Sequence, residues 1–354
     1  QQFMRLGADE REAYLSKKRS EAQNTAQDNP KDVSWKLNLL SKTHENMLGY
    51  EKNNSTLAYS IKTGQDLTVV PTNAILSGNP EAIAALSKNI KSIHANNVLN
   101  GTVGSLNPFS TQQQSELKQF WEKAKPGDKL SLLTSLYKSS AGNANASRDM
   151  INGIAGDSGA YRLSASLNNR GLQDIAGQIV TGQDLIEKGL VKVDESGLTK
   201  HTEAYLAGIT SPGKPDFQIY LDSIKANYAY LVQKSEKVTD SKGNILNKTI
   251  DEELFNKAAK NVTGGKFTSG GFFGSKSVVL RPHTVGEKSF REQLESFNSR
   301  NARNYGGSDK DFFLDLPLEQ DPKNPYVYYF KNGTKYIMDA TDKKRQKRLA
   351  FTVR

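Results

Sequence analysis

The chain lacks cysteine and has few residues of several other chemically active types. Its 354 residues include no Cys, only four His and only two Trp. Without a thiol, the chain cannot form a disulfide, use a cysteine nucleophile or bind zinc through thiolates. No stretch approaches the roughly 18 unbroken apolar residues that a membrane-spanning helix needs. The sequence therefore excludes thiol proteases and zinc fingers, and it predicts no membrane span.

Positive charge is concentrated near the C-terminal end. The net charge is +10, and residues 331–354 hold eight Lys or Arg against two Asp, a net of +6. Phosphate groups of nucleic acid or of lipid head groups are the natural partners of such a run. The alternative, which we rank first on sequence alone, is a solvated terminal turn. No aromatic residue is interleaved, so a base-stacking groove is not indicated. The candidate binding residues, named the basic cluster, are Lys343, Lys344, Arg345, Lys347 and Arg348.

The length and the spacing of apolar residues predict a mainly α protein with more than one folding unit. Domains usually run to roughly 100–200 residues, so two or three units are expected. Residues 1–60 are polar and predict a helical arm or linker, and residues 61–262 predict a helical body. We expect at least 45 % helix, which is above the usual share of roughly a third.

Capping signals mark where several of these helices begin. Asn79 followed by Pro80 predicts a capped start with proline at the first helical position. Ser110 with Gln113 predicts a capping box, and so does Thr249 with Glu252. Apolar residues then recur at helical spacing, for example at Ile83, Leu86, Ile90 and Ile93.

After residue 262 the pattern changes, and residues 263–354 predict a small mixed α/β domain with a basic end. Clustered glycines come first, followed by a predicted strand over 276–280 and a helix over 288–298. Asn332-Gly333 fits a type I′ turn that joins paired strands into a β-hairpin. The predicted fold class is thus mainly α: a multi-helix body with a small C-terminal mixed α/β domain containing a β-hairpin.

One glutamate offers a candidate catalytic residue. Glu195-Ser196 matches the pair that begins the active site of lysozyme-like lytic transglycosylases, in which a glutamic acid protonates a glycosidic oxygen. The Gly-Leu-Met-Gln and Tyr-Asn-Ala-Gly stretches that such enzymes carry downstream are missing. We therefore predict an exposed turn at Glu195 and no catalytic residue.

Other short motifs also lack their necessary partners. His201 and Glu203 mimic the His-x-Glu of zinc deaminases, but the two required cysteines do not exist. A phosphate loop at Gly265-Lys266 would need its first glycine at Lys260. Residues 240–244 lack the spacing of a calcium loop. We predict no metal and no cofactor, and we expect surface or packing roles for the isolated histidines His44, His94 and His283.

The order of several segments resembles a family of bacteriophage proteins. The resemblance is to the region downstream of the lytic transglycosylase domain in the large internal, or ejected, virion proteins of short-tailed phages and in tape-measure-like proteins of prophages. It covers residues 70–354, and its signatures are small-residue and packing patterns. The segments that carry it are 77–81, 130–136, 155–156, 179–183, 258–265 and 279–282.

The resemblance implies a structural virion protein, placed in the capsid interior or the tail and in the host envelope during infection. It would be ejected with the genome or guide it, and any lytic activity would reside in another segment of a longer protein. The implied partners are further copies of the chain, other phage internal, portal or tail proteins, and DNA or an anionic membrane at the basic end. Two alternatives stay open: a divergent peptidoglycan-lytic domain using Glu195, and a non-viral binding or adhesion module.

Overall fold

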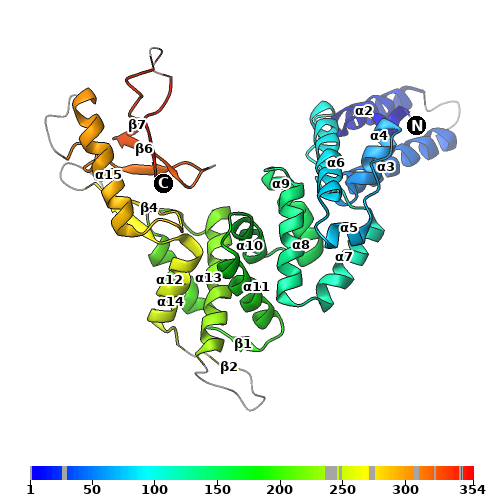
Figure 1. Ribbon diagram of the computed structural model, residues 1–354. Helices are drawn as coiled ribbons and strands as arrows, with labels where there is room; N and C mark the ends of the chain where they lie inside the picture. The colour runs from blue at the N-terminus through cyan, green and yellow to red at the C-terminus, as the bar shows by residue number, and fades with distance from the viewer. Residues whose placement is uncertain are drawn as a thin grey trace. The chain divides into compact units, whose positions relative to one another are not determined.

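A computed structural model describes residues 2–25, 30–235, 245–246, 249–270, 276–305, 311–322, 324–342, 344 and 346–354. The described chain is 64 % helical, with a small antiparallel sheet near its C-terminal end, so the predicted fold class is confirmed. The chain divides into two compact units, unit 1 over Gln1–Ala176 and unit 2 over Gly177–Arg354 (Figure 1). The domain boundaries predicted after residues 60 and 262 stay predictions about independent folding.

Unit 1 is built from helices. Those that the structure describes are α1 (Gln2–Arg5), α2 (Ala8–Thr25), α3 (Pro30–Asn53), α4 (Ser55–Thr63), α5 (Thr72–Leu76), α6 (Pro80–Leu99), α7 (Thr111–Lys123), α8 (Pro126–Ser139), α9 (Ala144–Ala155) and α10 (Gly159–Asn169).

The predicted caps at the starts of α6 and α7 are confirmed. The Asn79 side chain accepts hydrogen bonds from the backbone N–H groups of Glu81 and Ala82, and proline occupies the first turn of α6. Ser110 and Gln113 form the reciprocal capping box at α7. These side chains satisfy N–H groups that have no partner within the helix, and so they fix where each helix begins.

The core of unit 1 is centred on α8, most of whose residues are buried. Leu132, Leu133 and Leu136 are each at most 1 % exposed. Trp121 of α7 meets Tyr161 of α10 edge to face, with ring centroids 4.8 Å apart. The apolar stripes predicted from sequence therefore pack against one another across several helices.

Unit 2 contains helices and all the described strands. Its elements are α11 (Gln173–Glu187), which includes the boundary between the units, β1 (Val191–Lys192), α12 (Glu195–Leu206), α13 (Pro215–Lys234), β2 (Ile245–Leu246), α14 (Glu252–Thr263), β3 (Lys266–Ser269), β4 (Ser277–Leu280), α15 (Glu287–Asn301), the 3₁₀ helix η1 (Ala302–Tyr305), β5 (Leu318–Gln320), β6 (Val327–Asn332), β7 (Lys335–Tyr336) and β8 (Ala350–Thr352).

The capping box predicted from Thr249 and Glu252 is wrong. The N-cap of α14 is Asp251, whose side chain accepts a hydrogen bond from the backbone N–H of Leu254. Glu252 is then the first helical residue, too early to reach back over the helix start as a capping box requires. The N–H of Asp251 itself donates to the Tyr228 hydroxyl of α13, at 2.9 Å. This bond ties the start of α14 to the neighbouring helix.

The C-terminal strands form two antiparallel sheets. β3 pairs with β4, and in the second sheet β6 pairs with β5, β7 and β8. The predicted hairpin is confirmed, but its turn lies one residue further on, because Asn332 pairs with Lys335 and leaves Gly333 and Thr334 as the loop. Gly333 has a φ of 58°, and Ala141 is the only described non-glycine residue with positive φ. Positive φ at the first central residue alone is typical of a type II′ turn, not of type I′.

Aromatic rings fill the core between α15 and this sheet. Phe290 and Phe297 of α15 contact Phe351 of β8 with ring centroids 5.6 and 5.5 Å apart. The buried Tyr328 hydroxyl donates to the carbonyl of Leu280 at 2.7 Å, and burial raises the pKa of Tyr328. None of the described helices combines the length and the apolar character that crossing a membrane requires.

Candidate functional site

The described residues of the basic cluster, Lys344, Lys347 and Arg348, lie in a loop between β7 and β8 whose base is held by backbone pairing. Met338 forms a β-bridge with Arg348. On one side of the bridge the Asp339 N–H donates to Lys347 O at 2.8 Å, and on the other the Leu349 N–H donates to Ile337 O, also at 2.8 Å. The chain after the hairpin at Gly333 is thus paired a second time, between residues 337–339 and 347–349, and this pairing holds the two ends of the loop together.

Asp342 organises the loop from within. Its carboxylate accepts backbone N–H groups from Gln346 at 2.8 Å, Lys347 at 2.9 Å and Lys344 at 3.3 Å. The hydrogen bonds from Lys347 and Gln346 hold the pKa of Asp342 below its ordinary value. The bonds favour the charged carboxylate, so the loop is built around a negative centre although its outer side chains are cationic.

Three of the five predicted cations lie in the described chain. Lys344, Lys347 and Arg348 are all exposed, and no described carboxylate forms an ion pair with them. Lys343 and Arg345 lie outside the described residues. Cations that face water are in reach of a polyanion, which the prediction requires.

Arg348 differs from the two lysines because it lies over aromatic rings. Its guanidinium is 3.8 Å from the ring centroid of Tyr336 and 5.5 Å from that of Tyr329. Inspection of the sequence near the cations missed both rings, since they lie on β7 and β6. The alternation of side chains along the predicted hairpin strands could have indicated an aromatic face. It places Tyr329 on the same face of the strand as Lys331.

An acid–base network underlies this face of the sheet. The Tyr336 hydroxyl donates to Glu319 at 2.6 Å, which raises the pKa of Tyr336. Partial burial alone would raise the pKa of Glu319, but its bonds to Lys331 and Tyr336 outweigh burial and lower it. Lys331 forms an ion pair with Glu319, so its charge is compensated within the sheet. The charge of Arg348 also helps to lower the pKa of Glu319.

Glu195 is exposed as predicted, but the predicted turn is wrong, because Glu195 begins a helix that Asp194 caps. It is the first residue of α12, its side chain is 74 % exposed, and it forms an ion pair with Lys225. A general acid that protonates a glycosidic oxygen needs an environment that favours the neutral carboxyl. Glu195 is exposed and lies beside Lys225, so the structure gives it no enclosed apolar site of this kind.

The other motifs that fall within the described residues do not assemble into a site. Gly265 precedes β3, and Lys266 lies within that strand, so the residues compared with a phosphate loop form part of a sheet. The His201 ring packs against Phe255, and His283 Nε2 lies 2.8 Å from the Asn261 carbonyl. Across the described residues no group of three or more His, Asp or Glu is placed to hold a metal ion. Residues 240–244 lie outside the described residues.

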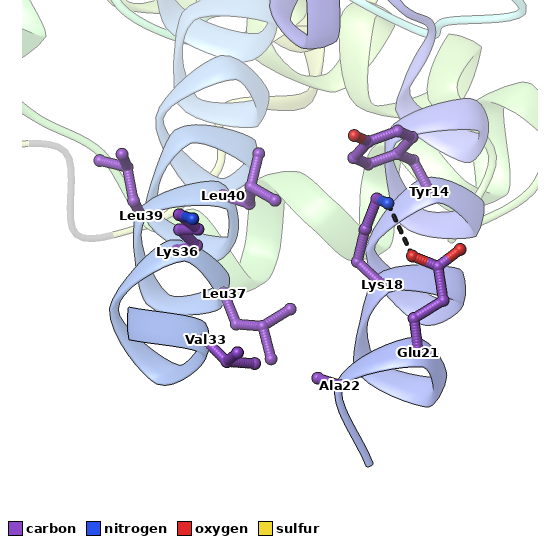
Figure 2. A pocket seen from close by; sticks show the side chains of 9 residues that line it. All are labelled: Tyr14, Lys18, Glu21, Ala22, Val33, Lys36, Leu37, Leu39 and Leu40. Atoms are coloured by element: carbon purple, nitrogen blue, oxygen red, sulfur yellow. Dashed lines mark hydrogen bonds and ion pairs between the residues drawn. The ribbon is translucent and has the colours of Figure 1, made fainter. Parts of the chain in front are cut away.

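A second surface, between α2 and α3, is open and apolar. A groove of about 370 Å³ lies between the two helices. Its lining side chains come from both of them (Figure 2). The lining residues are Tyr14, Lys18, Glu21, Ala22, Val33, Lys36, Leu37, Leu39 and Leu40. Apolar side chains form the walls, and the two lysines and the glutamate supply charge. The groove is suited to binding another polypeptide.

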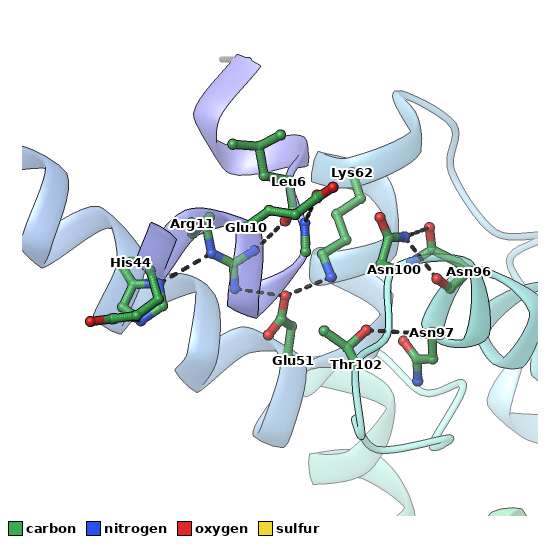
Figure 3. A network of polar contacts seen from close by, with 12 residues as sticks. Leu6, Glu10, Arg11, His44, Glu51, Lys62, Asn96, Asn97, Asn100 and Thr102 are labelled. Carbon is green, nitrogen blue, oxygen red and sulfur yellow. Dashed lines mark hydrogen bonds and ion pairs between the residues drawn. The ribbon is translucent and has the colours of Figure 1, made fainter. Parts of the chain in front are cut away.

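The base of the α2–α3 hairpin is fixed by a buried ionic network (Figure 3). Arg11 is fully buried and donates to Glu51 at 2.9 Å and to the Leu6 carbonyl at 2.6 Å. Lys62 Nζ of α4 lies 2.6 Å from the same Glu51 oxygen. Two buried cations, Arg11 of α2 and Lys62 of α4, therefore share the carboxylate of Glu51 on α3, and this links the three helices.

Comparison of the chain with protein families, with curated proteins and with solved structures found no match.

Proposed function

We propose that this chain is a structural protein of a bacteriophage particle, internal or tail-associated, which is ejected with the genome or guides it through the host envelope. The observation that carries the structural role is the open apolar groove of the α2–α3 hairpin. Trp35 of α3, which does not line the groove, is also 62 % exposed. A contiguous apolar patch on a folded protein marks a site of interaction. The phage assignment rests on the resemblance of residues 70–354 to internal virion proteins.

The proposed mechanism is assembly and delivery. The chain binds further copies of itself and other internal, portal or tail proteins, and it contributes no catalytic residue. The exposed lysines of the basic cluster add a contact to DNA or to an anionic membrane. An anchored cationic loop supports this role, since its backbone is held by Asp342 before any polyanion arrives.

The test is to locate the chain in native particles. Mass spectrometry of purified phage is expected to find it at a fixed copy number, and imaging of the particle is expected to find it in the capsid interior or the tail. Its absence from particles, or its presence only in uninfected cells, would exclude the proposal.

A peptidoglycan-cleavage assay distinguishes the structural role from the enzymatic alternative. Release of muropeptides from purified peptidoglycan by this chain, lost in Glu195→Gln, would show a lytic domain instead. We expect no release from either protein, because Glu195 is exposed and paired with Lys225.

A further inference from the structure

The outer half of the α2–α3 hairpin carries apolar residues that the rest of the described chain leaves at least partly exposed. We name residues 16–23 and 31–46 the hairpin tip. None of these side chains is buried. Five of the eight residues over 33–40 are nevertheless Val, Trp or Leu. Leu39 is 50 % exposed, in addition to Trp35. Burying such surface is worth roughly 25 cal/mol per Å², so an occupant of the tip would gain free energy.

The shape of this surface is concave. Val33, Leu37 and Leu40 follow helical spacing on α3 and face Ala22 and Tyr14 of α2 across the groove (Figure 2). Packed helices lie 8–10 Å apart with side chains interdigitated, so a third helix fits against two that already form a groove. A lipid surface would instead be met by a convex apolar ridge.

Charge selects among helical occupants. The hairpin tip contains six Lys or Arg against three Asp or Glu, a net of +3. Lys18 and Lys36 line the groove from opposite helices. Lys18 forms an ion pair with Glu21 of its own helix at 2.6 Å, so a carboxylate of the occupant would have to share or replace this partner. Two copies of this tip would repel each other, whereas an acidic helix would be attracted.

The tip is also held in place before binding. The buried contacts of Arg11 and Lys62 with Glu51 lock the hairpin base against α4 (Figure 3). A groove that is fixed in advance loses less conformational entropy when it is filled.

We propose that the hairpin tip binds an acidic amphipathic α-helix of another protein. The apolar residues of that helix, spaced at i, i+4 and i+7, would lie on Val33, Leu37 and Leu40, and its carboxylates would lie near Lys18 and Lys36. The inference deepens the proposed function, on which it rests, by giving the chemistry of one partner.

The experiment uses the full chain and three labelled synthetic peptides of equal length. The first is an amphipathic helix with Leu on one face and Glu on the other, the second has Lys in place of Glu, and the third has the acidic composition in scrambled order. Fluorescence anisotropy at low salt is expected to show the acidic helix binding at least tenfold more tightly than either other peptide.

Matched variants of the chain locate the binding. Leu37→Asp is expected to weaken binding of the acidic helix at least tenfold, and Leu99→Asp, at a leucine that is 85 % exposed outside the groove, is expected to leave it unchanged. Lys18→Glu with Lys36→Glu should reverse the preference in favour of the basic helix. The same double change at the exposed Lys88 and Lys118 of α6 and α7 is the control, expected to have no effect on the preference.

Several results would overturn the inference. Equal binding of the acidic and scrambled peptides would do so, and so would full binding by Leu37→Asp. Loss of self-association in Leu37→Asp, measured by sedimentation without peptide, would make the groove an interface between copies. Groove-dependent binding to anionic phosphatidylglycerol vesicles, with no peptide binding, would make it a lipid site. None of these measurements uses phage particles, so failure here is distinguishable from failure of the virion assignment.

Discussion

Gly182 of α11 lies directly against the backbone carbonyl of Ala226 on α13. A Cβ built on Gly182 would lie 1.7 Å from that oxygen, well inside any real contact distance. The two helices therefore meet backbone to backbone at this point, and only glycine permits so close an approach. The neighbouring Asn227 of α13 donates from Nδ2 to Gln178 of α11 at 3.2 Å.

This contact predicts opposite effects for two glycines of one helix. Gly182→Ala must push the helices apart and should destabilise unit 2 by about 1–3 kcal/mol or more. Gly177→Ala, where a Cβ would meet nothing within 4 Å, should stabilise the helix by about 0.5–1 kcal/mol. Urea unfolding followed by far-UV circular dichroism measures both. Equal stability of the two variants would contradict the close contact.

The buried network at the hairpin base predicts an unequal response to charge removal. Glu51→Gln leaves Arg11 and Lys62 buried without a carboxylate and should cost about 3–5 kcal/mol. Arg11→Met leaves Glu51 paired with Lys62 and should cost less. Trp35 and Trp121 both lie in unit 1, so tryptophan fluorescence during urea unfolding reports on this unit alone. A larger loss of unfolding free energy in Arg11→Met than in Glu51→Gln would contradict this prediction.

The bonds to Asp342 predict how the basic loop responds to acid. Because the folded pKa is lowered, the contribution to stability is fully present above the ordinary carboxyl value near 4 and is lost as pH falls through the lowered folded value. The protection of the Gln346 and Lys347 amides against hydrogen exchange, measured relative to their intrinsic rates at each pH, should therefore be high at neutral pH and fall on acidification. Asp342→Ala should show low protection at every pH, while Asp315→Ala, outside the loop, serves as the control.

Much of the fold could be predicted because its signals are local. The caps at Asn79 and Ser110 and the apolar stripe of α6 are fixed by neighbours within a few residues. The errors also arose locally, where two patterns compete. Asp251 outcompetes Thr249 as a cap, and Gly333 takes the first turn position that was assigned to Asn332.

The candidate sites were less predictable, because they depend on contacts between distant segments. Sequence alone indicated the basic cluster but not Tyr336 beneath Arg348. The β-bridge between Met338 and Arg348 brings this arginine next to the end of β7, where Tyr336 lies. The α2–α3 groove was missed for a similar reason. Residues 1–60 look polar on average, and only the structure shows that the few apolar ones share an uncovered groove.

The basic cluster predicts salt-dependent and sequence-independent binding to DNA. Five contacts to phosphate would give a slope of log affinity against log salt of about −4.5, because each neutralised phosphate releases roughly 0.9 of a counterion. Replacing Lys343, Lys344, Arg345, Lys347 and Arg348 by Ser should abolish this binding and leave helical content unchanged, since the loop lies in the sheet region.

Smaller changes separate the charge of Arg348 from its contacts with the tyrosine rings, which the variant with all five cations replaced cannot do. Lys344→Ser with Lys347→Ser removes two cations without packing partners and should reduce the slope by about 1.8 while leaving stability intact. Arg348→Ser removes one cation together with its contacts to Tyr336 and Tyr329, so it should reduce the slope by about 0.9 and also loosen the hairpin. Arg348→Lys keeps the charge but stacks less well, so it should retain the slope. Equal DNA and anionic-vesicle binding by the five-fold variant at low salt would leave the cluster as a solvated turn, the alternative that the sequence favoured.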